Sequence, residues 1–561
     1  MSKKIKYSSN QLAKYIADAP GVVKNYIQAL EKQVGNLANI GLALSKEKNM
    51  SKLLEMILIE AKRIANSDGG TLYMMTDDNR LRFEIMMTDS LDFHMGGTSG
   101  KEIPFYPVKL YDEEGNPNKS MIAAYVGLTG ETVNIPDAYK AKGFDFSGTK
   151  MFDEKTGYHS QSFLTVPLKN HEDEIIGVLQ LLNAQNNNTK KIIPFASDIQ
   201  EMVEALASQA AVAITNKNLI KDLEALFESF IKLIASAIDA KSPYTGGHCA
   251  RVPEITMLLA KAVQETIDGP FADISFTDKE MYELKIAAWL HDCGKVATPE
   301  FVVDKSTKLE TIYDRVNEVE TRFAALKRDE QIKSLRNELK VERDDSLSKE
   351  EKLIKIKTLK SKYSKKLREL KSDLEFIKES NIGGEFMSGD KKDRVHNISN
   401  YRWKPNGKME NFLSEDEVYN LTIPRGTLTA EERKVINDHI VVTINMLEEL
   451  PYPKHLKNVP EFAGGHHEKL DGTGYPKGLT KDEMSVQARI MAIADIFEAL
   501  TAKDRPYKKG KTLSQAMRIL GFMKNDAHID VDLFDIFVKD KIYLKYAEEH
   551  LDPDQIDEVQ M

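Results

Sequence analysis

Histidines and aspartates on the apolar faces of helical segments are the feature that most constrains how this chain can fold. In the segment "EMYELKIAAWLHDCGKVATP", apolar residues recur at steps of three and four, and the next position on that face is His291, followed by Asp292. His248 and His439 continue the apolar faces of their own segments in the same way. Asp495 lies in "QARIMAIADIFEALT", a helical segment that is apolar nearly all round. Each of these segments therefore places a polar group in a core.

An unpaired buried imidazole or carboxylate costs several kcal/mol, so these groups must pair with one another or with a metal ion. A single histidine of this kind is usually a core residue satisfied by hydrogen bonds. Here the stretch "GGHHEKLDGTGYPKG", which begins at Gly464, adds two adjacent histidines, and imidazole with carboxylate ligands suits iron, manganese or zinc. Because seven ligands exceed what one ion takes, we expect two divalent ions bridged by a carboxylate. The candidate ligands are His248, His291, Asp292, His439, His466, His467 and Asp495.

Length and charge limit the remaining possibilities. A chain of 561 residues is long enough for about three folding units. The formal net charge of -9 gives no broad positive field, so we expect no DNA partner and no membrane association. No apolar leader or spanning stretch is evident, which predicts a cytoplasmic protein. The two cysteines, Cys249 and Cys293, are too few for a disulfide framework and are interpreted as packing residues.

Residues 30–216 combine helix-like and strand-like patterns and follow an N-terminal helical segment over residues 1–29. "MSKLLEMILIEAKRIANS" has apolar residues at helical spacing, whereas "GGTLYMMTDDNRLRFEIMMT" predicts two strands around an Asp-Asp turn. "SFLTVPLKNHEDEIIGVLQLLNA" predicts another hairpin. The region is therefore expected to be an α+β domain with an antiparallel sheet covered by helices.

Three stretches of this region, "VGLTGETVNIPDAY", "FDEKTGYHSQSFLTVPL" and "IIGVLQLLNA", resemble the GAF domains of sensory proteins. The resemblance is strongest to the GAF domains of cyclic-nucleotide phosphodiesterases. In that family the sheet and its covering loops form a small-molecule pocket, although many members bind nothing known. The resemblance therefore implies either a ligand-sensing domain or one that serves dimerisation alone.

A long helical pattern comes next, with a seam of apolar residues at alternating steps of four and three over residues 217–237. One interpretation is an amphipathic helix packed on its own domain. The absence of a glycine or proline break between two domains favours a parallel homodimer helix that transmits strain. The seam consists of Leu219, Leu223, Leu226, Phe230, Leu233 and Ala237.

A second helical region is rich in charge. From Leu309 to Leu326, and again from Ile356 to Ile377, apolar residues step by three and four, and the polar break "ERDDSLSKEE" separates the two stretches. This pattern predicts an antiparallel helical hairpin. A less regular tail, "YRWKPNGKMENFLSEDEVYNLTIPRG", comes after it, so that the hairpin and tail form an insertion over residues 305–427.

The sequence on both sides of this insertion resembles the HD-GYP branch of the HD phosphohydrolases. The motifs are "LHDCGK", "HHEKLDGTGYP" and "AIADIFEALTAKDRPYKKG". The resemblance implies an all-α helical bundle with a di-metal site over residues 238–550, and hydrolysis of cyclic di-GMP as its usual activity. It implies one metal held by His248, His291, Asp292 and Asp495, with Asp292 bridging to a second held by His439, His466 and His467.

The resemblance also assigns residues to the substrate. Lys295 faces the substrate phosphate with Arg505 and Lys508, and the loop that contains Gly474 and Tyr475 shapes the wall beside the metals. A hydroxide that bridges two divalent ions is the implied nucleophile, with Asp292 and Lys295 as the catalytic residues. The expected protein is thus a GAF-regulated cyclic di-GMP phosphodiesterase.

Three departures from the family pattern bear on this expectation. Some members bind a third metal through a glutamate four residues before the first histidine, where this chain has Tyr244. The stretch from Asp495 to Arg505 is one residue longer than usual, and the insertion is additional. Two alternatives stay open: an HD phosphohydrolase for another cyclic dinucleotide or nucleotide, and a non-catalytic interaction module that uses the inserted hairpin.

Overall fold

The structure is a computed structural model that describes residues 20–241, 247–384, 386–405, 407–503 and 510–560. It divides into two compact units, Met1–Leu226 and Phe227–Met561. Among the described residues, no helix is long and apolar enough to cross a bilayer.

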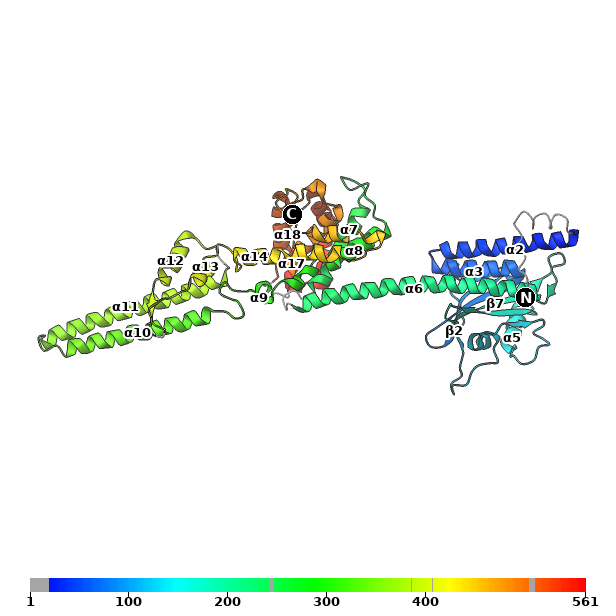
Figure 1. The fold of residues 1–561 in the computed structure, drawn as a ribbon, viewed down its shortest axis with the longest axis horizontal. Helices are drawn as coiled ribbons and strands as arrows, with labels where there is room; N and C mark the ends of the chain where they lie inside the picture. Colours follow the sequence, from blue (N-terminus) through cyan, green and yellow to red (C-terminus); the bar gives the residue numbers. More distant parts are fainter. Residues whose placement is uncertain (1–19, 242–246, 385, 406, 504–509, 561) are drawn as a thin grey trace, which may run out of the picture. The chain divides into compact units, whose positions relative to one another are not determined.

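The first unit is built on an antiparallel sheet in the order β3-β2-β1-β7-β6-β5, with β4 paired to β2 and β8 paired to β7 (Figure 1). The strands are β1 (Ser67–Met75), β2 (Arg80–Thr88), β3 (Phe93–Gly96), β4 (Val108–Lys109), β5 (Val133–Ile135), β6 (Phe163–Lys169), β7 (Ile175–Gln185) and β8 (Ile192–Ile193). Both hairpins expected from the sequence, β1-β2 and β6-β7, are confirmed. The outer pairs meet at the centre of the sheet, where β1 pairs with β7 from Ser67↔Ala184 to Met74↔Gly177.

Helices cover both faces of this sheet because successive strand residues point to opposite sides. On β1, Leu72 belongs to the cluster under the helices α2, α3 and α6, whereas the next residue, Tyr73, belongs to the cluster under α4. The helices of the unit are α2 (Gly21–Lys46), α3 (Met50–Ala65), α4 (Ile122–Thr129), α5 (Ser147–Thr156) and the first part of α6 (Ser197–Lys241), with the 3-10 turn η1 (Asp89–Leu91).

Helix α6 continues from the first unit into the second, and its second half has two different apolar faces. Ile231, Ala235 and Ile238 are buried in the core of the second unit. The seam predicted for dimerisation lies on the other face, where Leu223 is 65% exposed and Leu233 is 63% exposed. The helix therefore packs on its own domain without using that seam.

The second unit has a helical core that holds residues before and after the insertion. Capping boxes start two of the core helices, α8 and α14. The core helices are α7 (His248–Glu265), α8 (Asp278–Leu290), α9 (Glu300–Val303), α14 (Ala430–Asn437), α15 (His439–Glu448), α16 (Val459–Gly464), α17 (Val486–Thr501), α18 (Leu513–Asn525), α19 (Val531–Lys539) and α20 (Ile542–His550). The 3-10 turns are η2 (Cys293–Ala297), η3 (Lys454–Leu456), η4 (Lys481–Glu483) and η5 (Pro553–Gln555).

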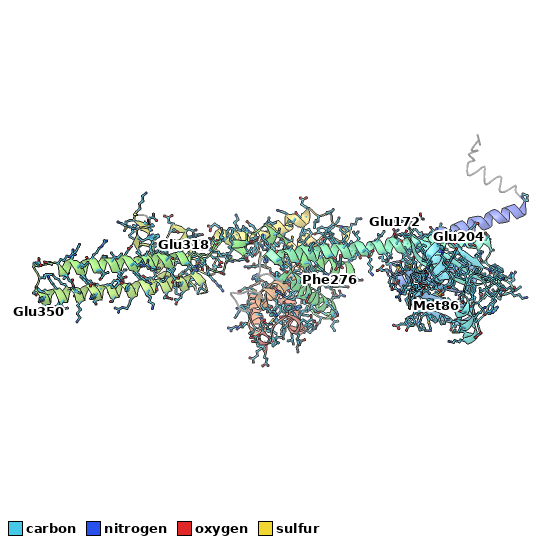
Figure 2. The ribbon with its side chains drawn as sticks, turned by 90° about the horizontal axis from the view of Figure 1, so that it is seen from below. Met86, Glu172, Glu204, Phe276, Glu318 and Glu350 are labelled. Carbon is cyan, nitrogen blue, oxygen red and sulfur yellow. The ribbon has the colours of Figure 1, made fainter. Side chains whose placement is uncertain are left out.

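The insertion forms a helical hairpin with a hydrophobic core of its own. Helices α10 (Val316–Glu342) and α11 (Lys349–Ile382) run side by side in opposite directions, and Figure 2 labels Glu318 and Glu350 near their opposite ends. The first helix begins later than its apolar pattern predicted, because Leu309 and Ile312 lie in the preceding loop and Ile312 is 92% exposed. After the hairpin comes α12 (Gly389–Ser399), and the tail that begins at Tyr401 has regular elements: β9 (Arg402–Trp403), β10 (Glu410–Asn411) and α13 (Glu415–Leu421).

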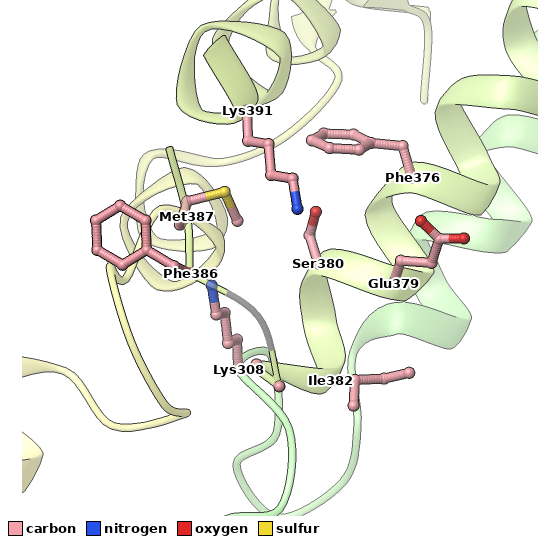
Figure 3. A pocket seen from close by; sticks show the side chains of 10 residues that line it. Lys308, Phe376, Glu379, Ser380, Ile382, Phe386, Met387 and Lys391 are labelled. Carbon is pink, nitrogen blue, oxygen red and sulfur yellow. The ribbon is translucent and has the colours of Figure 1, made fainter. Parts of the chain in front are cut away.

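A small cavity of about 210 Å³ lies where the end of α11 meets the segment that leads into α12 (Figure 3). Lys308 and Lys391 approach it from opposite sides, with Phe376 and Ile382 among its lining residues. The ammonium of Lys308 donates hydrogen bonds to the carbonyls of Leu421 and Ile423, at 3.1 and 2.8 Å. The buried lysine thus ties the hairpin base to the end of α13, and burial lowers its pKa to about 8.

Candidate metal centre

The seven candidate ligands lie at the ends or on the inner faces of five helices of the second unit. His248 is the first residue of α7, and His439 is the first residue of α15. His291 and Asp292 directly follow α8, His466 and His467 follow α16, and Asp495 lies within α17. His291 is fully buried, and Asp292, His439 and His466 are each 2% exposed. The expectation that these polar residues enter a core is confirmed.

A glycine allows two of the helices to approach closely. A Cβ atom at Gly294 would lie 2.0 Å from the carbonyl oxygen of His439 and 2.5 Å from the amide nitrogen of Thr443. The amide of Gly294 instead donates a hydrogen bond to the hydroxyl of Thr443, at 2.9 Å. This contact between η2 and α15 brings His439 next to Asp292, from the other side of the insertion.

Three of the imidazoles have their tautomer set by the same local hydrogen bond. In His291, His439 and His466, Nδ1 faces the carbonyl oxygen of the residue three positions earlier, at 2.8 Å in His291 and 2.6 Å in His466. Because a carbonyl oxygen only accepts, each Nδ1 carries a proton, and each ring in its neutral form presents the lone pair of Nε2 to the centre.

The Nε2 atoms meet carboxylate oxygens, which are also acceptors. One oxygen of Asp292, Oδ2, lies 3.2 Å from Nε2 of His248 and 3.3 Å from that of His291. The other oxygen, Oδ1, lies 3.2 Å from Nε2 of His439. Among the described residues, Oδ1 of Asp292 and Nε2 of His439 and His466 have no hydrogen-bond partner, although all three atoms are buried. These three buried atoms, which no side chain of the described residues satisfies, fit a shared cation.

The distances divide the ligands into two neighbouring groups. One consists of His248, His291 and Asp495, and within it the potential ligand atoms all lie within 4.8 Å of one another. The other consists of His439, His466 and His467 by the same measure. Asp292 has one oxygen toward each group, and it forms a further set with His291 and His466. The residues therefore can hold metal ions, and their arrangement has room for two groups of ligands.

Burial and charge act differently on the two groups. Burial, aided by the neighbouring His467, lowers the pKa of His466 well below its usual range, and burial lowers the pKa of His467 to about 4. Both rings are therefore neutral at pH 7. Burial would also lower the pKa of His291, but Asp292 and Asp495 raise it to about 9. A cation bound by His291 would displace that proton.

Lys295 lies beside Asp292. Its ammonium donates a short hydrogen bond to Oδ2 of Asp292, and its side chain is 27% exposed. Burial opposes the charge of the lysine, but the carboxylates of Asp292 and Asp495 outweigh this and raise its pKa. Burial likewise opposes ionisation of Asp292, whereas Lys295 and His291 hold the pKa of its carboxyl well below the usual range. Both charges are thus stable at pH 7.

The glycine-rich loop closes over the second group of ligands. The ring of Tyr475 stacks on His467 with ring centroids 4.9 Å apart, and its amide donates to the His467 carbonyl at 3.3 Å. Gly474 is required by close packing, since a Cβ there would lie 2.3 Å from the amide nitrogen of Lys469. The buried carboxylate of Glu468 anchors the loop by accepting hydrogen bonds from the amides of Lys477 and Leu479, at 2.7 and 2.9 Å.

Two further residues support the centre and were missed by the sequence analysis. Nδ1 of His248 makes a short hydrogen bond to Glu498, which is 1% exposed. Arg251 in turn binds Glu498 from the other side, with Nε 2.8 Å from its second oxygen. A carboxylate in this place fixes the ring of a ligating histidine. Its signal was available, because Glu498 follows Asp495 by three residues on the same apolar helix.

Some predicted residues cannot be placed. Arg505 and Lys508, expected at the substrate phosphate, and Tyr244, which replaces the family's third-metal glutamate, lie outside the described residues. The stretches on either side of them, which end at Lys241 and Lys503 and resume at Gly247 and Gly510, are described.

Two family models match the chain. A GAF domain matches residues 49–214, and an HD domain matches residues 415–533, which include His439, His466, His467 and Asp495. The HD match begins at α13, inside the predicted insertion, and does not reach His248 or Asp292. The fold and the site thus define an α+β domain and a helical domain whose residues could bind metal. The chain contains a GAF domain followed by an HD-type domain.

Similar proteins are cyclic dinucleotide phosphodiesterases by name. A 3'3'-cGAMP-specific phosphodiesterase 3 of Vibrio cholerae is 39% identical over 19% of this chain and 22% of its own length. A second from the same organism, 3'3'-cGAMP-specific phosphodiesterase 1, is 43% identical over 14% of this chain and 19% of its own length. A cyclic di-GMP phosphodiesterase of Pseudomonas aeruginosa is 45% identical over 13% of this chain and 17% of its own length. The chain thus spans about a fifth of the length of these relatives.

Proposed function

We propose that this protein is a metal-dependent phosphodiesterase that hydrolyses cyclic di-GMP and is regulated by its GAF domain. The observation that carries the proposal is the arrangement around Asp292, whose two buried oxygens face Nε2 of His248 and His291 on one side and Nε2 of His439 on the other. The HD-domain match and the names of the relatives support the same reaction class.

The proposed cofactors are two divalent ions, iron or manganese, with zinc as a further candidate. His248, His291, Asp292 and Asp495 would hold one ion, and Asp292, His439, His466 and His467 the other. When bound, such ions activate water for attack on phosphorus and offset charge on the phosphate oxygens.

The chain's own residues bind and orient the phosphodiester. Lys295, charged and partly exposed, would donate to a non-bridging phosphate oxygen and stabilise the charge that develops there. Tyr475 and the loop at Gly474 would bound the substrate beside His467, with Arg505 and Lys508 as further phosphate ligands. Cleavage breaks one phosphorus–oxygen bond of the ring, and the leaving oxygen takes up a proton.

A second candidate substrate is a mixed cyclic dinucleotide. Two of the relatives are named as 3'3'-cGAMP-specific enzymes, and the metal centre contacts the phosphodiester that both substrates share. The difference between them lies in the bases, which the residues around Asp292 do not read.

The dimer belongs to the proposal as well. The seam of α6 is exposed along its length while a different face of the helix packs on its own domain. An apolar stripe of this kind fits a second copy of the same helix. We propose a parallel homodimer through residues 217–237, with the GAF domain, with or without a small-molecule ligand, as the regulatory input.

The test is a turnover assay on the full chain loaded with Mn²⁺ or Fe²⁺, with cyclic di-GMP, 3'3'-cGAMP and a linear dinucleotide as substrates. We expect hydrolysis of a cyclic dinucleotide that stops on chelation and returns on metal addition. A preference for 3'3'-cGAMP selects the second candidate. A metal-loaded protein that turns over no cyclic dinucleotide would contradict the proposal and favour an interaction module.

A further inference from the structure

The last residue of α6 contacts the turn that carries Lys295. The ammonium of Lys241 donates hydrogen bonds to the carbonyl oxygens of Lys295, at 3.3 Å, and Thr298, at 2.7 Å. It donates a third to the carbonyl oxygen of Val296. Three bonds use the full donor capacity of an ammonium group, so Lys241 is committed to this turn.

The first part of this turn is held by α15, on which Gly294 packs, whereas Lys241 contacts its second part, from Lys295 to Thr298. The turn is the 3-10 helix η2, closed by hydrogen bonds from the Lys295 amide to the Asp292 carbonyl, at 2.9 Å, and from the Thr298 amide to the Lys295 carbonyl, at 3.1 Å. Such short 3-10 segments have poorer hydrogen-bond geometry than an α-helix, and a cation at their carbonyl end is stabilising. Lys241 therefore holds the backbone from which the Lys295 side chain reaches Asp292.

The same turn of α6 also contacts the segment that begins at His248. The carboxylate of Asp239 accepts a hydrogen bond from the amide of Gly247, at 3.0 Å, and a longer one from the amide of Cys249, at 3.5 Å. These two amides flank His248. The end of α6 thus contacts two segments that precede the insertion. One is the turn that carries Lys295, and the other is the start of α7, which carries His248.

We propose that Lys241 is a positioning residue that sets the place of Lys295 against the reacting phosphate, and that α6 acts on the reaction through this contact. The inference rests on the proposed function. Its structural basis is continuity, because α6 runs from Ser197 to Lys241 without a glycine or proline at which a displacement could be absorbed. Its first part is buried in the core of the GAF domain through residues such as Leu206 and Ala210.

The experiment compares the full-length parent with Lys241→Met, which removes the ammonium, and Lys241→Arg, which keeps charge and donors. Lys221→Met is the matched control, since Lys221 is an exposed residue of the same helix. Two quantities are measured on metal-loaded protein: kcat and KM for cyclic di-GMP, and hydrogen–deuterium exchange of the peptide that covers residues 293–301 without substrate. Metal content and melting temperature are recorded for each variant.

For Lys241→Met we expect kcat to fall about tenfold with KM and metal content within twofold of the parent, typical of a displaced charge-stabilising group. Exchange in the 293–301 peptide should quicken at least tenfold while the rest of the domain is unchanged. Lys241→Arg should recover part of both effects, and Lys221→Met should match the parent. If Lys241→Met does not fold, Lys241→Gln, which keeps two N–H donors but no charge, should change the two quantities in the same direction.

Unchanged kcat and unchanged exchange in Lys241→Met would overturn the proposal. So would faster exchange spread evenly over the domain together with lost metal, because that result describes a folding role. If the parent hydrolyses no cyclic dinucleotide, the proposed function fails, but the exchange measurement still decides whether Lys241 holds the turn of Lys295.

Discussion

The central histidines share one local device, a proton on Nδ1 held by the carbonyl three residues earlier. It occurs in His291, His439 and His466, each near the end of a helix or at the start of one. Because the partner lies in the same segment, the tautomer is fixed before the segments come together. The position of the proton on Nδ1 is therefore set within each segment, whereas the approach of the three Nε2 atoms to one another depends on the tertiary fold.

Asp292 is the residue on which both groups of ligands depend. Asp292→Ala removes the two oxygens that face His248 and His439, so we expect metal content to fall from two ions per chain to less than one, with loss of turnover. Metal analysis by plasma mass spectrometry checks this. Asp495→Ala is the matched variant, since Asp495 belongs to one group alone and its loss should spare the ion at His439. Two ions retained in Asp292→Ala would show that the carboxylate does not bridge.

Lys295 is expected to serve chemistry and not folding. Its side chain is partly exposed and its contact with Asp292 is one of several that this carboxylate receives. Lys295→Ala should keep the metals and the melting temperature and lose about a hundredfold in kcat, the effect of removing one charge-stabilising donor. Lys261→Ala, an exposed lysine of α7, is the control. Full activity in Lys295→Ala would exclude the proposed role.

The burial of the candidate ligands was predictable in part from local pattern, because helical periodicity places His291 on an apolar face and Asp495 lies in a segment that is apolar nearly all round. The supporting residues were less accessible. Glu498 shared the face of Asp495, but a single acid in an apolar helix does not reveal which histidine it meets. The contact of Gly294 with His439 joins residues on opposite sides of the insertion, and no local pattern records it. A list of candidate ligands can thus be predicted from local patterns, but their arrangement in a site depends on tertiary contacts of this kind.

At the scale of elements, the sequence predicted the GAF sheet and the hairpin well, since alternation and heptad-like spacing are local. It placed the start of α10 too early because Leu309 keeps the apolar spacing although it packs from a loop. The tail of the insertion was expected to be less regular, and the short helices α12, before it, and α13, within it, were missed because their apolar faces are completed only by the hairpin base. The insertion core and the HD core are separate clusters.

The insertion meets the rest of the second unit at a defined contact. The buried ammonium of Lys305 lies 2.8 Å from the carboxylate of Glu432 on α14, the helix that ends just before His439. The hydroxyl of Thr427 donates to the Lys305 carbonyl at 3.0 Å, so the two ends of the insertion lie side by side. A short connection can therefore replace residues 306–426 without stretching the base.

Replacement of residues 306–426 by a short Gly-Ser linker should preserve folding and metal content while changing turnover or its response to the GAF domain. The physical reason is that the insertion has its own core but touches α14 beside a metal ligand. Circular dichroism, metal analysis and the turnover assay measure these three properties. A variant that loses its metals or does not fold would show that the insertion is part of the catalytic core.

A matched variant separates the base of the insertion from its arm. Lys360 and Glu338 are paired at 3.8 Å across the hairpin, so residues 339–359 can be replaced by a tight turn that shortens the arm and leaves its base intact. If the base gates the site, this variant should behave like the parent. Should both variants behave like the parent in every assay, the insertion is a docking arm for another protein.

At the scale of the whole molecule, the proposed regulation depends on α6 serving two purposes at once. One face packs into the second unit through Ile231 and Ile238, and the exposed seam on another face is the surface proposed to bind a second copy. Each residue added to a helix rotates the rest of that helix by about 100°. Insertions in α6 can therefore change the angle about the helix axis between the seam residues of the first unit and those of the second unit.

Duplication of residues 220–226 adds one heptad, which leaves the seam within about 20° of its original phase, whereas insertion of two alanines after Leu226 turns the second half by about 200°. We expect the heptad variant to remain a dimer with the parent's turnover. The two-residue variant should dimerise more weakly or lose its regulated turnover, since Leu219 and Leu223 would then face away from Phe230 and Leu233. Analytical ultracentrifugation and the turnover assay measure the two properties.

Both insertions must leave the contacts of Lys241 untouched, which unchanged hydrogen exchange over residues 293–301 would establish. If the two variants behave alike, helix phase carries no information between the domains, and the seam serves association alone or another partner.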